Sequence, residues 1–282
     1  MPTVTVVVLT MGDRPTELAA AIESARRQSV DVEIVLVING GDPDRSLADI
    51  VVDPGENLGI PEGRNCGAAA GTGTLICFLD DDGALRGDVF GPAVEAFAAS
   101  NQLGVIGLRV VDEHGKTARR HLPGLRKDAE RSAPATAFAG GACLLRRSAF
   151  DEVKGLCGPF RYGLEETDLS WRMISDGWDV QYRSDLQIYH PRTSPARHPE
   201  FFFHTARNRV WLAHRLLPLP IGLVYVFNWT AITLAKNFLA PASILSHLRG
   251  TIAGFRSRPG PRNPISWTAV MELTRRGRPP LV

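Results

Sequence analysis

The first part of the chain alternates between continuous apolar runs and segments whose apolar residues repeat with helical spacing. The continuous runs predict strands at Thr3–Leu9, Glu33–Ile38, Ile50–Val52, Leu75–Leu79 and Gly104–Val111. The helical spacing predicts helices at Thr16–Arg27, Ile60–Ala70 and Val89–Ala99. Continuous apolar strands separated by helices are typical of an α/β fold, in which helices cover both faces of a mostly parallel central sheet.

The pattern weakens after Asp112. Residues Asp112–Pro134 are polar and basic without clear periodicity, which is typical of a functional loop or a lid. Beyond this loop we expect a strand at Ala142–Leu145, helices near Ser148–Val153 and at Glu166–Asp176, and a strand at Leu186–Tyr189.

The C-terminal part of the chain is apolar and nearly free of acidic residues. Leu216–Leu248 contains one formal charge, Lys236, and the 20 uncharged residues Leu216–Ala235 are about the length that crosses a bilayer core. Prolines and Asn228 interrupt them, so we expect a domain over residues 1–215 followed by a helical extension over 216–282 that lies on an anionic membrane surface. An oligomer interface, a helical cap on the domain and a true membrane span are the alternatives.

Charge is unevenly distributed along the chain. The formal net charge is +2, but eleven basic residues and one acidic residue lie between Arg207 and the C-terminus. An anionic surface is therefore the expected partner of this segment, and we expect no nucleic-acid partner. The four cysteines show no paired spacing, and the apolar run Val4–Leu9 leads into a turn without a basic leader. We therefore expect a cytoplasmic protein, peripheral on the inner face of the cell membrane.

The most informative candidate chemistry lies at the end of one predicted strand. Asp80, Asp81 and Asp82 directly follow the apolar run Leu75–Leu79. Three adjacent carboxylates cost free energy unless a cation or water compensates them. At the carboxyl end of a strand in an α/β sheet they indicate a site for Mn²⁺ or Mg²⁺, which would in turn bind a diphosphate. The structural alternative is an acidic turn that caps the helix near Asp88.

Three further segments lie where a nucleotide would bind if the sheet is parallel. One follows the first strand and one follows the second, while the third opens a helix with glycines and an arginine that could pair with phosphate. These segments supply Thr10, Gly12, Asp13, Arg14, Asn39, Asn57, Gly59, Arg64 and Asn65. The chain has neither G-x-G-x-x-G after the first strand nor a G-K-[ST] loop, which argues against dinucleotide oxidoreductases and P-loop NTPases.

A second acidic cluster, Glu165, Glu166 and Asp168, begins a predicted helix. Acidic residues in a first turn complement the helix dipole, and Asp168 has an arginine four residues later as an ion-pair partner. This structural interpretation does not require both glutamates, and one carboxylate could act as general base toward an acceptor hydroxyl. His190 is either a structural histidine or, together with Asp82, a mixed N/O metal ligand.

Taken in order, these motifs resemble the inverting glycosyltransferases of family 2, which have the GT-A fold. Among them, the chain is similar to bacterial rhamnosyltransferases and galactofuranosyltransferases. The resemblance covers about residues 3–215 and includes Gly140-Gly141-Ala142 and the segment Glu165–Arg172. It implies metal-dependent transfer of a sugar from a nucleoside-diphosphate sugar to a hydroxyl acceptor, namely a glycan or lipid-linked glycan of the cell envelope.

The resemblance also assigns roles to individual residues. It implies that Asp80 and Asp82 lie at the diphosphate and metal, with His190 as a third metal contact. It assigns the catalytic base to Glu166, although many relatives have Glu-Asp at this position, so Glu165 is the alternative base. Thr10, Asp13 and Asn39 would line the nucleoside pocket, and Trp171 and Arg172 would support the helix. The other residues expected at the substrate are Gly12, Arg14, Asn57, Gly59, Arg64, Asn65, Asp81, Gly140, Gly141, Asp168 and Trp171 itself.

Two other functions remain open from the sequence. A nucleotidyltransferase that makes activated sugars also has an α/β sheet and metal-binding carboxylates. Such enzymes usually carry a Gly- and Arg/Lys-rich loop after the first strand, where this chain has only Gly12-Asp13-Arg14. A non-catalytic protein that binds nucleotide sugars and docks on a membrane would not need both acidic clusters to be intact.

Overall fold

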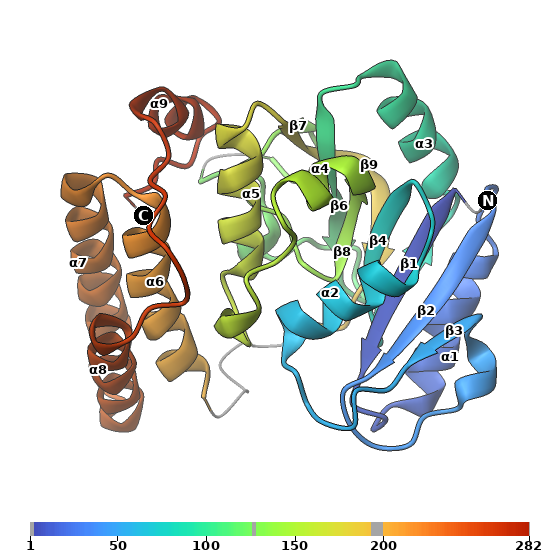
Figure 1. The fold of residues 1–282 in the computed structure, drawn as a ribbon, viewed down its shortest axis with the longest axis horizontal. Coiled ribbons are helices and arrows are strands. Elements are labelled where there is room, and N and C mark those ends of the chain that lie inside the picture. The colour runs from blue at the N-terminus through green and yellow to red at the C-terminus, as the bar shows by residue number, and fades with distance from the viewer. Residues whose placement is uncertain (1–2, 126–127, 193–199, 282) are drawn as a thin grey trace.

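The computed structural model describes residues 3–125, 128–192 and 200–281 of the chain (Figure 1). Among these residues, a mixed sheet of nine strands forms the centre of the molecule, in the order β3-β2-β1-β4-β8-β6-β9-β5 with β7 beside β9. Helices cover both faces of the sheet, and the C-terminal helices form a further layer at the end of the molecule opposite β2 and β3. This is the α/β fold with a helical extension that the sequence predicted.

The first four strands of the chain are parallel, as predicted. β1 (Val4–Thr10) pairs with both β2 (Val32–Ile38) and β4 (Leu75–Asp80), and β3 (Ile50–Val52) extends the sheet beside β2. The residues of β1 and β4 are almost all buried, because helices cover the sheet on both sides. Their carboxyl ends meet at one edge of the sheet, and this edge carries the first acidic cluster.

Beyond β4 the sheet is mixed. β8 (Ala142–Arg146) lies between β4 and β6 (Leu103–Val111) and is antiparallel to both. β9 (Asp179–Tyr189) is parallel to β6, and the short strands β5 (Ala84–Arg86) and β7 (Ala133–Pro134) pair with β9 in the antiparallel direction. The sequence could not predict the direction of β8, since a strand buried on both faces has the same apolar pattern in either direction.

β9 begins well before the predicted strand Leu186–Tyr189. Its first part alternates buried Val180 and Tyr182 with partly exposed polar residues. Period-two alternation gives a weaker apolar signal than a continuous run. The prediction therefore recognised only the apolar end of the strand, which leads to His190.

The helices on the two faces of the sheet belong to two hydrophobic clusters. α1 (Pro15–Arg26) and α3 (Phe90–Ala99) pack on one face. α2 (Ile60–Ala70), α4 (Arg147–Glu152) and α5 (Glu165–Ser175) pack on the other. Short 3₁₀ turns lie at Arg45–Leu47, Arg119–His121 and Gly158–Phe160. The second of these turns belongs to the long loop Asp112–Pro134, of which residues 126 and 127 lie outside the described residues.

The C-terminal layer consists of α6 (Phe201–Leu216), α7 (Leu219–Lys236), α8 (Pro241–Arg256) and α9 (Trp267–Arg275). α6 contacts α5, α7 and α8, so it lies between the sheet-covering helices and α7 and α8, whereas α9 contacts α5 directly. Gly250 and Gly254 of α8 allow close contact with α6, because a Cβ atom at either position would clash with α6. α6 packs against α5 of the predicted first domain and also against α7 and α8 of the predicted extension. The domain boundary at residue 215 therefore stays a prediction.

Within the described residues, one helix is long and apolar enough to cross a membrane, judged by length and composition alone. This helix is α7, and only 11% of its 18 residues are buried inside the protein.

Candidate active site

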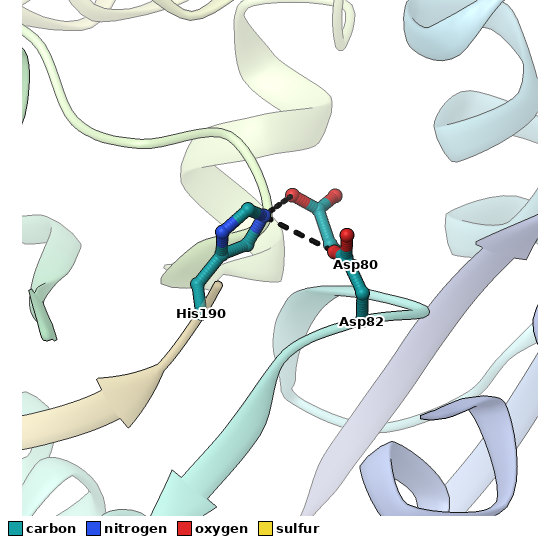
Figure 2. A group of neighbouring side chains, drawn as sticks. All are labelled: Asp80, Asp82 and His190. Carbon is teal, nitrogen blue, oxygen red and sulfur yellow. Dashed lines mark ion pairs between the residues drawn. The ribbon is translucent and has the colours of Figure 1, made fainter. Parts of the chain in front are cut away.

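Asp80, Asp82 and His190 form a compact group at the carboxyl edge of the sheet (Figure 2). Asp80 ends β4, Asp82 lies in the turn that follows, and His190 directly follows β9. The Nε2 atom of His190 lies 3.1 Å from Asp82 Oδ1 and 3.9 Å from Asp80 Oδ2. One ligand atom from each residue lies within 4.8 Å of the others. Two carboxylates and an imidazole at this spacing suit one divalent cation such as Mn²⁺ or Mg²⁺.

The orientation of the His190 ring supports this assignment. Its Nδ1 atom lies 2.8 Å from the carbonyl oxygen of Pro191, which can only accept a hydrogen bond, so Nδ1 carries a hydrogen and donates it. The other nitrogen, Nε2, therefore faces the two carboxylates (Figure 2). Burial lowers the pKa of His190, but the hydrogen bond to Asp82 and the charges of Asp82 and Asp80 outweigh burial and raise it overall. In the neutral ring, Nε2 would be the metal ligand.

Arg64 connects this group to the second acidic cluster. Its side chain is buried, donates to Asp80 Oδ1 over 2.8 Å, and lies 3.9 Å from Glu165 Oε1. Burial opposes the positive charge, but the carboxylates of Asp80, Glu166 and Glu165 outweigh it and raise the pKa of Arg64. Arg64 thus holds a fixed positive charge between the candidate metal ligands and the candidate bases. From the sequence we expected Arg64 to face a phosphate, and its bridge between the two acidic clusters was not predicted.

The two glutamates at the start of α5 have different surroundings. Glu165 is 2% exposed and its Oε2 atom has no hydrogen-bond partner among the described residues. Burial, together with the charge of Glu166, raises its pKa to about 8. Glu166 is partly exposed, and burial raises its pKa against the opposing charge of Arg64. Glu166 is therefore the glutamate that a molecule in solution can reach.

Gly140 and Gly141 allow the start of β8 to approach both acidic clusters. A Cβ atom at Gly141 would clash with the carboxylate of Asp80, and one at Gly140 would clash with Glu166 and Arg64. The backbone of Gly141 also accepts a hydrogen bond from the Asp80 amide over 3.3 Å. These glycines are therefore needed for the shape of the site, which explains the Gly-Gly pair that the sequence analysis singled out.

Residues at the end of β1 hold the remaining carboxylate. Thr10 Oγ1 donates to Asp81 over 2.7 Å, and Arg14 forms ion pairs with Asp82 at 2.6 Å and Asp81 at 3.3 Å. Burial raises the pKa of Asp81, against the opposing effects of Thr10 and Arg14. The exposed Asp13 follows Gly12, whose amide donates to Thr10 Oγ1. Thus the segments after β1 and β4, which the sequence predicted to be close, share hydrogen bonds.

Asn39, predicted for the nucleoside pocket, and Asn57, predicted at the substrate, shape the loop before α2. The side chain of Asn39 accepts from the amide of Leu58 over 3.0 Å and donates to the carbonyl of Gly59 over 3.2 Å. Asn57 accepts from the amide of Gly59 over 2.8 Å. The side-chain amides of Asn39 and Asn57 thus fix the backbone of the loop before α2, at the sheet edge that carries the first acidic cluster.

Three of the predicted substrate residues make their polar or aromatic contacts elsewhere in the protein. Asn65 bonds to the backbone amide and carbonyl of Leu156, both over 2.9 Å. Asp168 is fully buried between Arg172, as the ion-pair interpretation predicted, and Arg215 of α6. Trp171 is buried with its ring against Tyr225 of α7. The contacts of these residues stabilise α2 and α5.

The turn that precedes Glu165 is held by α6, which the sequence analysis did not anticipate. Leu164 and Arg161 have left-handed backbones with φ of 71° and 55°, a conformation that is unfavourable for non-glycine residues. Asn208 of α6 is fully buried, and its Nδ2 atom donates to the carbonyls of Phe160, Tyr162 and Gly163 over 2.8–3.0 Å. An asparagine within a helix gives no distinctive sequence signal, so only the structure could reveal this contact.

The basic loop Asp112–Pro134 reaches the same edge of the sheet. Arg120 and His121 line a small cavity of about 20 Å³ together with His190. Burial and the neighbouring charges of Arg120 and His190 lower the pKa of His121 to about 4. The loop therefore contributes positive charge beside the candidate metal ligands.

Comparison with known proteins gives a family match over the first part of the chain. The model of the family "Glycosyl transferase family 2" matches residues 5–154, which is more than half of the 282 residues. The match includes Asp80 and Asp82, whereas His190 and the two glutamates lie beyond it. No curated protein sequence is significantly similar to the chain.

Several solved structures of glycosyltransferases have a similar GT-A fold. The mannosyltransferase PcManGT from Pyrobaculum calidifontis, in complex with GDP-Man and Mn²⁺, has a TM-score of 0.60 at 17% identity, with 97% of this chain and 79% of that chain covered. GalNAc-T7 with UDP, GalNAc and Mn²⁺ has a TM-score of 0.62 at 16% identity, with 92% and 56% covered. TarS of S. aureus has a TM-score of 0.56 at 16% identity, with 75% and 39% covered, so this chain spans well under half of its length.

Proposed function

Because the chain belongs to glycosyl transferase family 2, we propose that it moves a sugar from a nucleoside-diphosphate sugar to an acceptor hydroxyl, with inversion at the anomeric carbon. Family membership makes it a glycosyltransferase, while the donor, the stereochemistry and the metal dependence belong to the proposal. One observation carries these finer points. Arg64 bridges Asp80, in the candidate metal site, and Glu165, next to the candidate base Glu166, so the two acidic clusters belong to one site.

The donor side of the proposed site consists of Asp80, Asp82 and His190. These residues would hold a divalent ion, which when bound supplies positive charge to the diphosphate leaving group. The presence of Mn²⁺ with nucleotide ligands in the structures of PcManGT and GalNAc-T7 supports Mn²⁺ or Mg²⁺ as the ion. Arg14 lies 2.6 Å from Asp82 and adds a second positive charge close to the expected position of the diphosphate.

The acceptor side of the proposed site is Glu166. Its carboxylate removes the proton of the acceptor hydroxyl while that oxygen forms a bond to the anomeric carbon. The bond between this carbon and the diphosphate oxygen breaks in the same step, and the bonding electrons leave with the nucleoside diphosphate. Attack from the face opposite the leaving group inverts the configuration. The raised pKa of Glu166 suits this role, because a base with a higher pKa takes up a proton more readily.

We assign the acceptor to glycans or lipid-linked glycans of the cell envelope. The basic loop beside His190 supports an anionic acceptor, and the apolar C-terminal helices support a lipid-linked one. Transfer rates to a lipid-linked acceptor and to its water-soluble headgroup, measured with the same donor, test this assignment. We expect faster transfer to the lipid-linked form, and equal rates would contradict it.

The proposed reaction can be tested with a panel of UDP-, dTDP- and GDP-sugars. We expect one donor class to raise the melting temperature in the presence of Mn²⁺ and not in EDTA, since a ligand that binds only the folded state stabilises it by about 2.7 kcal/mol at one hundred times its Kd. The anomeric configuration of the product should then be opposite to that of the donor when measured by NMR. A product with retained configuration, or consumption of a nucleoside triphosphate, would contradict the proposal.

A further inference from the structure

α7 and α8 expose an unusual amount of apolar surface. Most of the exposed large apolar side chains among the described residues lie on these helices and the turn between them, and Phe227 and Leu239 are 71% and 83% exposed. Apart from the adjacent pair Leu223 and Val224, they recur on each helix every three or four residues, so they form one stripe per helix. The exposed residues are Leu219, Leu223, Val224 and Phe227 of α7, Phe238 and Leu239 of the turn, and Leu245, Leu248, Ile252 and Phe255 of α8. We call this set the apolar face.

The α7 stripe of the apolar face meets the C-terminal end of the α8 stripe at one cavity. Leu223 and Phe227 of α7 and Phe255 of α8 line one cavity of about 370 Å³, which also reaches α6. The other lining residues are mostly apolar, and the exceptions include Arg258 and Arg262. The α7 stripe and Phe255 at the end of the α8 stripe therefore border a common groove with positive charge nearby.

The charge around the apolar face has one sign. Neither α7 nor α8 contains an acidic residue. Arg249 and Arg256 are exposed on α8, and neither forms an ion pair among the residues that the structure describes. Arg258 and Arg262 follow α8 and donate to backbone carbonyls, so their charges are likewise not neutralised by carboxylates. An apolar surface bordered by unneutralised arginines is complementary to an anionic amphiphile.

We propose that the apolar face docks on an anionic lipid leaflet. Its apolar side chains would enter the boundary of the acyl chains, while Arg249 and Arg256 contact headgroup phosphates. A second copy of the chain is the poorer partner, because a symmetric contact would bring two surfaces of the same positive charge together. This inference does not depend on the proposed reaction, and it corresponds to a peripheral position on the inner face of the cell membrane.

The packing of α7 favours docking over a transmembrane arrangement of this helix. Arg209 of α6 lies with its guanidinium 4.0 Å from the centre of the Trp229 ring of α7. Gly222 and Tyr225 of α7 are also buried. A spanning α7 would lose these contacts with α6 or bring the charge of Arg209 toward hydrocarbon, which is unfavourable. We therefore expect α7 to lie along the leaflet with α6 behind it.

Sedimentation of the full chain with lipid vesicles tests this proposal. We expect binding to vesicles of equal parts phosphatidylglycerol and phosphatidylcholine, weaker binding at high salt, and little binding to phosphatidylcholine alone. The double substitution Arg249→Glu with Arg256→Glu should weaken binding at least about tenfold, since each basic residue near an anionic surface contributes to it. Leu223→Glu with Phe227→Glu should weaken it similarly, because the apolar contact is lost.

The matched control is Arg27→Glu directly after α1, which lies at the other end of the molecule (Figure 1); the Arg27 side chain is 74% exposed. This variant should bind vesicles like the unmodified chain, and unchanged circular dichroism and melting temperature would show that each variant folds. Absence of binding to anionic vesicles at low salt, or equal binding to neutral ones, would overturn the proposal. So would a dimer in light scattering that the Leu223→Glu, Phe227→Glu variant dissociates, or vesicle-bound protein that only detergent releases. These outcomes do not test the chemistry of sugar transfer, which is measured separately; they bear only on the lipid-linked acceptor that the same apolar helices support.

Discussion

Glu165 and Glu166 are adjacent in the chain but differ in the chemistry available to them. Glu165 is enclosed beside Arg64 and has a pKa of about 8, so it is mostly protonated at neutral pH when no donor is bound. Glu166 is partly exposed beside Gly140. A general base must reach the proton that it removes, and this requirement favours Glu166 over its neighbour.

Substitution of each glutamate distinguishes their roles. Glu166→Gln removes the base while keeping the size of the side chain, so we expect turnover to fall by about 10²–10⁴-fold with donor binding retained. Glu165→Gln should have a much smaller effect on turnover, because that side chain is already mostly neutral. Initial rates and calorimetric titration with the nucleoside diphosphate check both variants, and normal turnover by Glu166→Gln would remove the base assignment.

The raised pKa of Glu165 predicts how stability depends on pH. The folded state holds this proton up to about pH 8, whereas an ordinary glutamate releases it near pH 4.5. The stabilisation that comes from protonated Glu165 is complete below about pH 4.5. It is lost as the pH rises toward about 8, at up to about 1.4 kcal/mol per pH unit. Glu165→Gln should remove this loss, so its free energy of unfolding should decline less than that of the unmodified chain between pH 5 and pH 8.

Urea unfolding at several pH values in the presence of a chelator checks this prediction. A decline of the same size in both proteins would show that Glu165 titrates normally in the folded state.

The sequence predicted which residues meet at the sheet edge better than it predicted what each of them contacts. Asp80 and Asp82 follow a strong apolar run, so their place at the sheet edge followed from the pattern. For His190 the pattern left a structural role open, and the family resemblance implied the metal contact that its place beside the aspartates fits. Arg64 was expected at a phosphate, but the structure buries it between carboxylates. That contact depends on how α2 and α5 pack on the sheet, which local sequence patterns do not specify.

At the scale of elements, α6 holds the start of α5 in position. Asn208 donates to three carbonyls of the turn before Glu165, and Arg215 pairs with Asp168 over 2.9 Å. The turn contains two left-handed non-glycine residues, so it needs support from its surroundings to persist. Asn208 is thus a positioning residue for Glu166.

The variant Asn208→Ala tests this role. Buried carbonyls left without a donor cost about 1–3 kcal/mol, so we expect the turn to relax and kcat to fall at least about tenfold, since misplacement of a catalytic group by about 1 Å can cost a hundredfold. The Kd for the nucleoside diphosphate should change little, because the donor residues lie at and just after the ends of β4 and β9. Asn228→Ala on α7, which loses one hydrogen bond to the Leu281 carbonyl, is the control. Loss of kcat and donor affinity to the same extent would indicate general destabilisation instead.

Strand prediction succeeded where burial is continuous and was incomplete where it alternates. β1, β2 and β4 have uninterrupted apolar runs, and their parallel order follows from the intervening helices. The direction of β8 and the early start of β9 at Asp179 depend on pairing with distant strands. α6 lacks an apolar run, because its buried residues include His204, Thr205 and Asn208.

At the scale of the whole molecule, α6 links the candidate active site to the apolar face. One side of α6 contacts the turn before α5, and the other packs against α7 and α8. The chain before Arg207 carries the acidic excess, and the chain from Arg207 onward carries the basic excess. This distribution separates a metal-binding region from a region suited to an anionic surface. The sequence predicted the charge separation, whereas the connecting role of α6 required the structure.

The central claim is that Asp80, Asp82 and His190 hold a metal ion which binds the diphosphate of the donor. Calorimetric titration with UDP and GDP, in Mn²⁺ and in EDTA, tests it most directly. For at least one of the two nucleotides, we predict that EDTA and the substitution Asp82→Ala each weaken binding at least about tenfold, because a carboxylate ligand of the ion is removed or the ion itself is absent. Asp151→Ala, at an exposed carboxylate of α4, should bind like the unmodified chain. Equal affinity with and without Mn²⁺, unchanged by Asp82→Ala, would contradict the claim.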